Sequence, residues 1–164
     1  MPFLPVPGHL GSDYEKLRPD FKVIADPYWG KDVLLVPAIV PDVALIHAVE
    51  ADAEGNLLLD EKEDDFLLAR ASRVVVASAE EIVATDTLRR APYGVRLSGI
   101  YVTALVHVPG GAHPTACRGR YGVDEEHMKE YLRLAGSDAA FREYVQRYVF
   151  DLKDHAAYLE QAGL

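Results

Sequence analysis

Short apolar runs bounded by proline and glycine organise the middle of this chain. Three of them are Val33–Val36, Val43–His47 and Leu57–Leu59, and Val74–Ala77 is a fourth. Runs of this length without polar alternation are typical of strands buried on both faces, as in a parallel sheet. The pattern therefore predicts four strands, with a turn at Ala53–Asn56 before the third.

Helical periodicity and further strands follow these runs. Asp64–Ser72 has acidic residues at its start, which favour a helix N-terminus, and Glu80–Arg90 also has a helical pattern. A strand pair is predicted at Val95–Leu97 and Val102–Val108, followed by the loop Pro109–Pro114. Strands that alternate with helices predict a layered α/β fold.

After Asp124 the pattern becomes helical. Apolar side chains recur at helical spacing, and Ser137 or Asp138 is a candidate N-cap for the second helix. A last helix is predicted over Asp154–Gln161. The two apolar stripes are Met128, Tyr131, Leu132 and Ala135, then Phe141, Tyr144, Val145, Tyr148 and Val149. Such stripes predict helix packing.

The first thirty residues are rich in proline and glycine, including Pro2, Pro5 and Pro7. Because both residue types interrupt regular structure, little helix or strand is expected there. We therefore predict a loop-rich entry over 1–31, an α/β core over 32–123 and a helical tail over 124–164.

Charge and cysteine content narrow the class of function. The 164 residues carry a formal charge of −9 and have a pI near 5.1, which argues against nucleic acid or an anionic membrane as partner. A lone cysteine, Cys117, has no internal partner for a disulfide. The start of the chain lacks a basic signal-peptide region and no run is long enough to span a membrane. These features predict a soluble cytoplasmic protein that acts on a small molecule or another protein.

Four short strings of the sequence occur together in one order. They are Pro2–Gly8 with Leu10–Asp13, Pro41–His47 leading to Ala51–Asn56, Glu81–Thr85, and Gly110–Thr115. In this order they resemble the A-type (alpha) subunit of family I coenzyme A transferases. The resemblance is to the glutaconate branch and to the related ring-opening hydrolase subunits of steroid degradation, and it covers the C-terminal half of that subunit.

The resemblance implies a NagB/RpiA-like layered sheet with C-terminal helices. It also implies an acyl-CoA site shared with a B-type subunit, with coenzyme A as substrate and no covalently bound cofactor. In this family a glutamate attacks the thioester to form an anhydride. That glutamate belongs to the B-type subunit, and the glycine-rich coenzyme A loop belongs to the first half of the A-type subunit. We therefore expect no catalytic nucleophile in this chain. A second chain would carry the remaining half, so that the sequence is a split subunit, a truncated product or a fragment.

Two loops are the candidate substrate-binding segments. Paired glycines let backbone N–H groups approach a ligand, so Gly111, His113 and Thr115 form one candidate set. Gly11 and Ser12 form the other. Each loop has an alternative interpretation, in which the first only packs at an interface and the second only caps a helix near Tyr14.

Other reactive side chains have structural interpretations. Glu54–Asn56 resembles the surroundings of the family's nucleophile but is typical of a turn, and Cys117 is interpreted as a spectator thiol, although nearby arginines would lower its pKa. No two histidines have helical i, i+4 spacing, so we predict no metal. The remaining candidates are Glu50, Glu80 and Glu81 as nucleophiles, His47 and His107 as core histidines, and Arg89, Arg90, Arg118 and Arg120 as either phosphate ligands or solvated surface charge.

Three functions stay open at this point. The chain is part of an acyl-CoA:carboxylate coenzyme A transferase and is inactive alone, or part of a ring-opening hydrolase on the same scaffold, or a non-catalytic scaffold. The sequence leaves the acyl substrate and the oligomeric state open.

Overall fold

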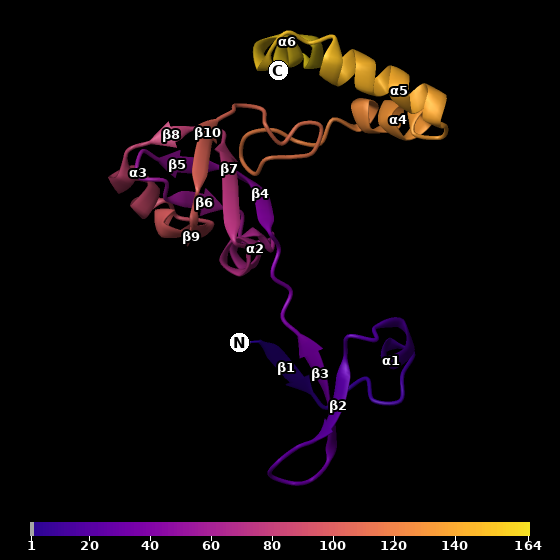
Figure 1. Ribbon diagram of the computed structural model, residues 1–164. Helices are drawn as coiled ribbons and strands as arrows, with labels where there is room; N and C mark the ends of the chain where they lie inside the picture. Colours follow the sequence, from indigo (N-terminus) through magenta and orange to yellow (C-terminus); the bar gives the residue numbers. More distant parts are fainter. Residues whose placement is uncertain (1) are drawn as a thin grey trace. The chain divides into compact units, whose positions relative to one another are not determined.

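The computed structural model describes residues 2–164, in two compact units that divide between Val40 and Pro41 (Figure 1). Each unit has its own sheet structure, and the two are described separately below. Within residues 2–164, no helix combines the length and the apolar character needed to cross a lipid bilayer.

The first unit is a three-stranded antiparallel sheet. The strands β1 (Phe3–Val6), β2 (Lys22–Ala25) and β3 (Asp32–Pro37) have the order β1-β3-β2, and the short helix α1 (Tyr14–Leu17) connects the first two. The prediction of little regular structure was therefore wrong. Pro5 is tolerated because β1 is an edge strand, where a missing N–H costs least. The apolar run in β3 belongs to this antiparallel sheet and not to a parallel one.

The second unit contains the predicted parallel sheet. Strands β4 (Val43–Ala48), β7 (Val74–Ala79) and β10 (Ala104–His107) lie in the order β10-β7-β4 with all neighbours parallel. Side chains alternate along β4 and β7, so that Ala44, Ile46 and Val75 enter the core. The predicted α/β layering is confirmed, and the carboxyl ends of three strands meet at one edge.

A second, mixed sheet packs on the core face of the parallel one. It has the order β8-β5-β6-β9, formed by Ile82–Val83, Glu50–Asp52, Leu57–Leu59 and Val95–Leu97. All three leucines of β6 are buried, as predicted, but this strand pairs antiparallel with both neighbours. The predicted pairing of β9 with β10 was wrong, because the 3-10 turn η1 (Gly99–Tyr101) separates them and they join different sheets.

Most helices match their predicted places and one was overextended. Helix α2 spans Asp65–Ala71, whereas the predicted helix over Glu80–Arg90 is reduced to α3 (Thr85–Arg90), because Ile82–Val83 pairs as β8. The tail comprises α4 (Glu125–Leu134), α5 (Asp138–Val145), the π-helical turn η2 (Gln146–Phe150) and α6 (His155–Ala162).

Side-chain caps and aromatic packing hold the tail together. Ser137 is the N-cap of α5, because its Oγ accepts a hydrogen bond from the backbone N–H of Ala140. This confirms the first of the two predicted N-caps, Ser137 and Asp138. The predicted packing role of the tyrosines is confirmed: the rings of Tyr131 and Tyr144 lie 5.2 Å apart and those of Tyr144 and Tyr148 4.8 Å apart.

Candidate functional site

Glu80 lies at the carboxyl edge of the parallel sheet and joins three segments. Its carboxylate bonds His47 Nε2 at 2.6 Å and accepts from Tyr121 Oη at 2.5 Å and the Gly110 amide at 2.8 Å. Burial alone would raise the pKa of this carboxyl, but the hydrogen bonds from Tyr121, Gly110 and His47 outweigh it and lower the pKa. Glu80 therefore ties the end of β4 to the segment after β10.

The loop after β10 is fitted closely against that edge. A Cβ on Gly111 would lie 2.7 Å from His47 Cε1 and 2.8 Å from the Val108 carbonyl oxygen, so only glycine fits there. The His47 Nδ1 atom bonds Ser78 Oγ at 2.7 Å, which confirms the predicted hydrogen-bonded core histidine. His107 was also predicted to be a core histidine, but this prediction was wrong because the residue is exposed. Its Nε2 atom bonds the backbone carbonyl of Glu80.

A hollow of about 500 Å³ opens beside this edge. His47, Thr115 and Cys117 line it, together with Asp60, Asp65 and Arg118. Thr115 donates its hydroxyl to the Ala112 carbonyl, which holds the loop in a turn. The predicted loop therefore lies at the expected end of the strands, where α/β sheets generally place their ligands.

His113 lies away from that hollow. Its side chain is 2% exposed, Nδ1 bonds Tyr158 Oη at 2.6 Å and Nε2 bonds Asp124 at 3.1 Å. The imidazole thus joins the loop to the helical tail. Any effect of His113 on a ligand in the hollow has to be exerted through the loop backbone.

Gly11 and Ser12 form the turn before α1 in the first unit. Gly11 has a φ of +72° and its N–H donates to Glu15 Oε1, while Ser12 Oγ donates to the His9 carbonyl at 2.6 Å and accepts from the Tyr14 amide at 3.3 Å. These contacts form the turn that leads into α1, whose N-cap is Asp13 without a side-chain cap hydrogen bond, so Ser12 is not the cap itself. A role for Gly11 and Ser12 in substrate binding stays a prediction.

Two of the candidate arginines, Arg118 and Arg120, form ion pairs with neighbouring carboxylates, among them the candidate nucleophiles Glu50 and Glu81. Arg120 contacts Glu50 at 3.0 Å and Glu81 at 2.8 Å, and Arg118 contacts Asp60 at 3.1 Å and Glu61 at 2.7 Å. Arg118 faces the hollow and its charge is already balanced there. Glu54 is exposed in the turn that the sequence predicts, where Gly55 has a φ of +82°.

Cys117 is buried, and its pKa moves opposite to the expectation from the neighbouring arginines. Burial and the charges of Glu80 and Asp60 raise the pKa of the thiol to about 11, because together they outweigh the lowering by Arg120. We expect iodoacetamide to alkylate the native protein at pH 8 about 100-fold more slowly than an ordinary thiol, since the thiolate fraction falls in proportion. Mass spectrometry of labelled protein measures this rate. The guanidinium-unfolded chain is the control, and equal rates in both states would contradict the prediction.

Sequence reasoning missed three features of this region. Glu80 was considered only as a nucleophile, whereas the structure makes it a fixed acceptor, and Tyr121 was not considered at all. Asp124, which accepts from the backbone N–H of His127 at 2.9 Å, was treated only as the start of the helical tail. An aspartate three residues before a histidine at a helix start is the signal that could have shown this cap.

Comparisons with known proteins agree with the geometry. The family model described as "Coenzyme A transferase" matches residues 9–107. The A-type chain of glutaconate CoA-transferase from Acidaminococcus fermentans is 34% identical over 99% of this chain and 56% of its own length. The crystal structure of that enzyme superposes with a TM-score of 0.87 at 33% identity, over 99% of this chain and 57% of its own.

Two further relatives have different activities in their names. The cholesterol ring-cleaving hydrolase IpdA subunit of Rhodococcus jostii is 32% identical over 94% of this chain and 55% of its own length. The structure of the decarboxylase AibA/AibB is 39% identical with a TM-score of 0.74, over 90% of this chain and 54% of that one. The chain thus spans about half the length of these relatives.

Proposed function

This chain belongs to the coenzyme A transferase family, with the sequence of an A-type subunit, and from that premise we propose that it forms one wall of an acyl-CoA site. The observation that carries the proposal is the carboxyl edge of the parallel sheet, where the Gly110–Thr115 loop is held by Glu80 beside the hollow. The family match spans all three strands of that sheet.

In this proposal the loop positions the acyl-CoA and does not attack it. Gly111 allows the loop to pack against His47, the Thr115 hydroxyl holds the turn through the Ala112 carbonyl, and His113 orients the loop from behind through Tyr158 and Asp124. Substrate contacts from Gly11 and Ser12 are part of the same proposal. The thioester is attacked by a glutamate of a B-type partner, and coenzyme A is the substrate that leaves and returns.

A further polypeptide covers the outer face of the parallel sheet. Leu45 is 75% exposed and Val106 53% exposed on that face, and with Val76 they line a hollow of about 440 Å³. Parallel sheets are covered on both faces in stable proteins, because their strands are apolar on both sides. The relatives contain almost as much polypeptide again outside the matched region. We propose that the equivalent polypeptide occupies this face.

Ring-opening hydrolysis is the second candidate, favoured by the IpdA relative. Both reactions use an acyl-CoA ester and differ in the acceptor, so product analysis separates them. Exchange of coenzyme A onto a free carboxylic acid supports the transferase, and a ring-opened acyl-CoA without exchange supports the hydrolase.

The test is co-expression of this chain with the products of its neighbouring genes, followed by copurification and assay of both reactions. We expect a complex with activity, and we expect Leu45→Asp to abolish copurification of the covering polypeptide because it buries a charge. Leu67→Asp is the matched control, since Leu67 is 63% exposed on α2 and off that face. A complex that has neither activity would support the hypothesis of a non-catalytic scaffold. If the Leu45→Asp variant still copurified with the covering polypeptide, the proposal that this polypeptide occupies the outer face of the parallel sheet would be contradicted.

A further inference from the structure

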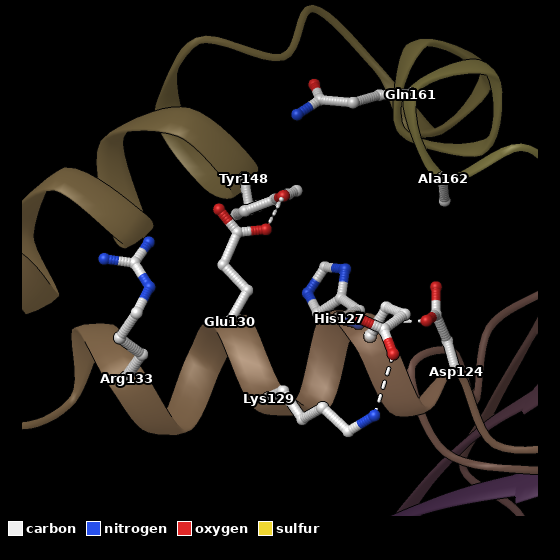
Figure 2. Close-up of a pocket in the computed structure, with 9 residues that line it drawn as sticks. Asp124, His127, Lys129, Glu130, Arg133, Tyr148, Gln161 and Ala162 are labelled. Atoms are coloured by element: carbon white, nitrogen blue, oxygen red, sulfur yellow. Dashed lines mark hydrogen bonds and ion pairs between the residues drawn. The ribbon is translucent and has the colours of Figure 1, made fainter.

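Three potential metal ligands converge where the Gly110–Thr115 loop meets the helical tail. They are His113 in the loop, Asp124 at the N-cap of α4 and His127 in its first turn, and their ligand atoms all lie within 4.8 Å of one another. The His113 and His127 side chains are buried, and Asp124 is partly exposed. Asp124 and His127 line a hollow of about 510 Å³ together with Glu130 and Tyr148, and Figure 2 shows these four side chains.

Each of the three side chains is fixed by a hydrogen bond on one of its two ligand-capable atoms. Tyr158 Oη bonds His113 Nδ1 at 2.6 Å, and Tyr144 Oη bonds His127 Nε2 at 2.8 Å. The His127 backbone N–H donates to Asp124 Oδ1 at 2.9 Å. The other atom of each pair is then the candidate ligand atom: His113 Nε2 and Asp124 Oδ2, which bond each other, and His127 Nδ1. Hydrogen bonds on the outer atoms are the arrangement that orients metal ligands in proteins.

We propose that His113, Asp124 and His127 bind a divalent transition-metal cation. The chemistry of the three ligands favours Zn²⁺. Two imidazole nitrogens and one carboxylate oxygen are a common zinc set, and a fourth position would face the hollow. The His113 Nε2 to Asp124 Oδ2 distance is 3.1 Å. Tetrahedral bonds of about 2.0–2.1 Å place neighbouring ligand atoms roughly 3.3 Å apart, so this pair already has the required spacing. The His127 atom lies within 4.8 Å of the other two and would have to come to the same spacing on binding.

Binding replaces the hydrogen bond between His113 and Asp124. The Asp124 carboxylate can only accept, so in the metal-free chain His113 Nε2 carries the proton of this bond. Metal binding therefore requires that the His113 ring keep its proton on Nδ1 instead, where it would be donated to Tyr158. His127 would likewise donate its ring proton from Nε2 to Tyr144. The ligands and their orienting tyrosines come from the loop, α4, α5 and α6. A bound cation would therefore cross-link the helical tail to the loop at the sheet edge.

A second cluster, His47, Glu80 and Cys117, is a weaker candidate. Both nitrogens of His47 and both oxygens of Glu80 already make hydrogen bonds within the protein, at Ser78, Tyr121 and Gly110. A metal there would break several of these bonds. The prediction of no metal relied on histidine spacing within one helix, whereas His113 and His127 come from different elements and are joined only by the fold.

Zn²⁺ itself is the probe. The chain is stripped with EDTA, dialysed and titrated calorimetrically with Zn²⁺, and we expect one bound equivalent and a higher thermal midpoint with the metal present. Asp124→Asn should weaken Zn²⁺ binding at least about 10-fold and remove the thermal shift, because asparagine is a poor zinc ligand but keeps the helix cap. His127→Asn should have the same effect.

Glu126→Gln is the matched control, because it removes the same charge from the same hollow and helix turn without touching the three ligands. It should bind Zn²⁺ as the parent does, and so should Cys117→Ser, which alters only the second cluster. The proposal is overturned if the parent takes up no Zn²⁺, if Asp124→Asn and Glu126→Gln weaken binding equally, or if Cys117→Ser abolishes it. None of these outcomes depends on coenzyme A chemistry.

Discussion

Replacing Asp52 with alanine is expected to lower the free energy of unfolding by about 3 kcal/mol. Asp52 is fully buried at the end of β5, and its carboxylate accepts from the Glu54 amide at 3.0 Å, the Asn56 amide at 2.9 Å and Asn56 Nδ2 at 2.8 Å. Asn56 in turn accepts from the Gly99 amide at 2.9 Å. Alanine would leave these donors buried without an acceptor and would release the turn from η1.

Urea unfolding followed by circular dichroism measures this loss. Glu54→Ala is the matched control, since Glu54 is an exposed acidic residue of the same turn, and its removal should change stability by less than about 0.5 kcal/mol. Equal effects of the two substitutions would show that the charge of the turn, and not the buried acceptor, stabilises it. The same two substitutions also test the interpretation of Glu54–Asn56 as a structural turn.

Local pattern predicted the parts of the fold that depend on local burial. The apolar runs at Val43–His47 and Val74–Ala77 form adjacent strands of the parallel sheet, and the aromatic residues of the tail pack between its helices. The spacing of apolar residues in these segments follows from which side chains are buried, so these elements can be predicted from a single sequence. The family resemblance then indicated the arrangement that these strands take.

Pairing between strands was not predictable in the same way. Leu57–Leu59 and Val33–Val36 have the composition of buried parallel strands, yet both pair antiparallel. Short apolar runs are compatible with both parallel and antiparallel pairing, and the connections between the strands decide which pairing forms. The Gly99–Tyr101 turn directs β9 and β10 into different sheets, and no local signal in Val95–Val108 indicates this.

Half of the candidate site was accessible to sequence reasoning. The paired glycines before Ala112 and His113 marked the correct loop, because glycine is required where backbone meets His47. The partners of that loop come from distant positions, since Glu80 and Tyr121 meet it only in three dimensions. Hydrogen bonds between residues far apart in the sequence cannot be recognised from residue spacing. For this reason the sequence indicates Glu80 only as a candidate nucleophile and not as a positioning residue.

Glu80→Gln is expected to lower the free energy of unfolding by about 2–4 kcal/mol at pH 7, and to reduce any activity of the assembled enzyme by loosening the Gly110 loop. The Glu80 side chain is 7% exposed and bonds His47, Tyr121 and Gly110. A glutamine amide can accept at one oxygen only. Its NH₂ group would face a donor, so at least one of these hydrogen bonds is lost.

The pH dependence has a definite sign. Because the folded-state pKa of Glu80 is lowered, its contribution is present above the unfolded pKa of about 4.3 and is lost as pH falls through the folded value. The stability difference between the parent and Glu80→Gln should therefore be largest above about pH 5 and shrink below about pH 4. Glu81→Gln is the control, since Glu81 is 50% exposed and pairs only with Arg120 at the surface, and it should cost less than about 1 kcal/mol. A difference that stayed constant down to about pH 3 would mean that the charge of Glu80 does not hold the loop.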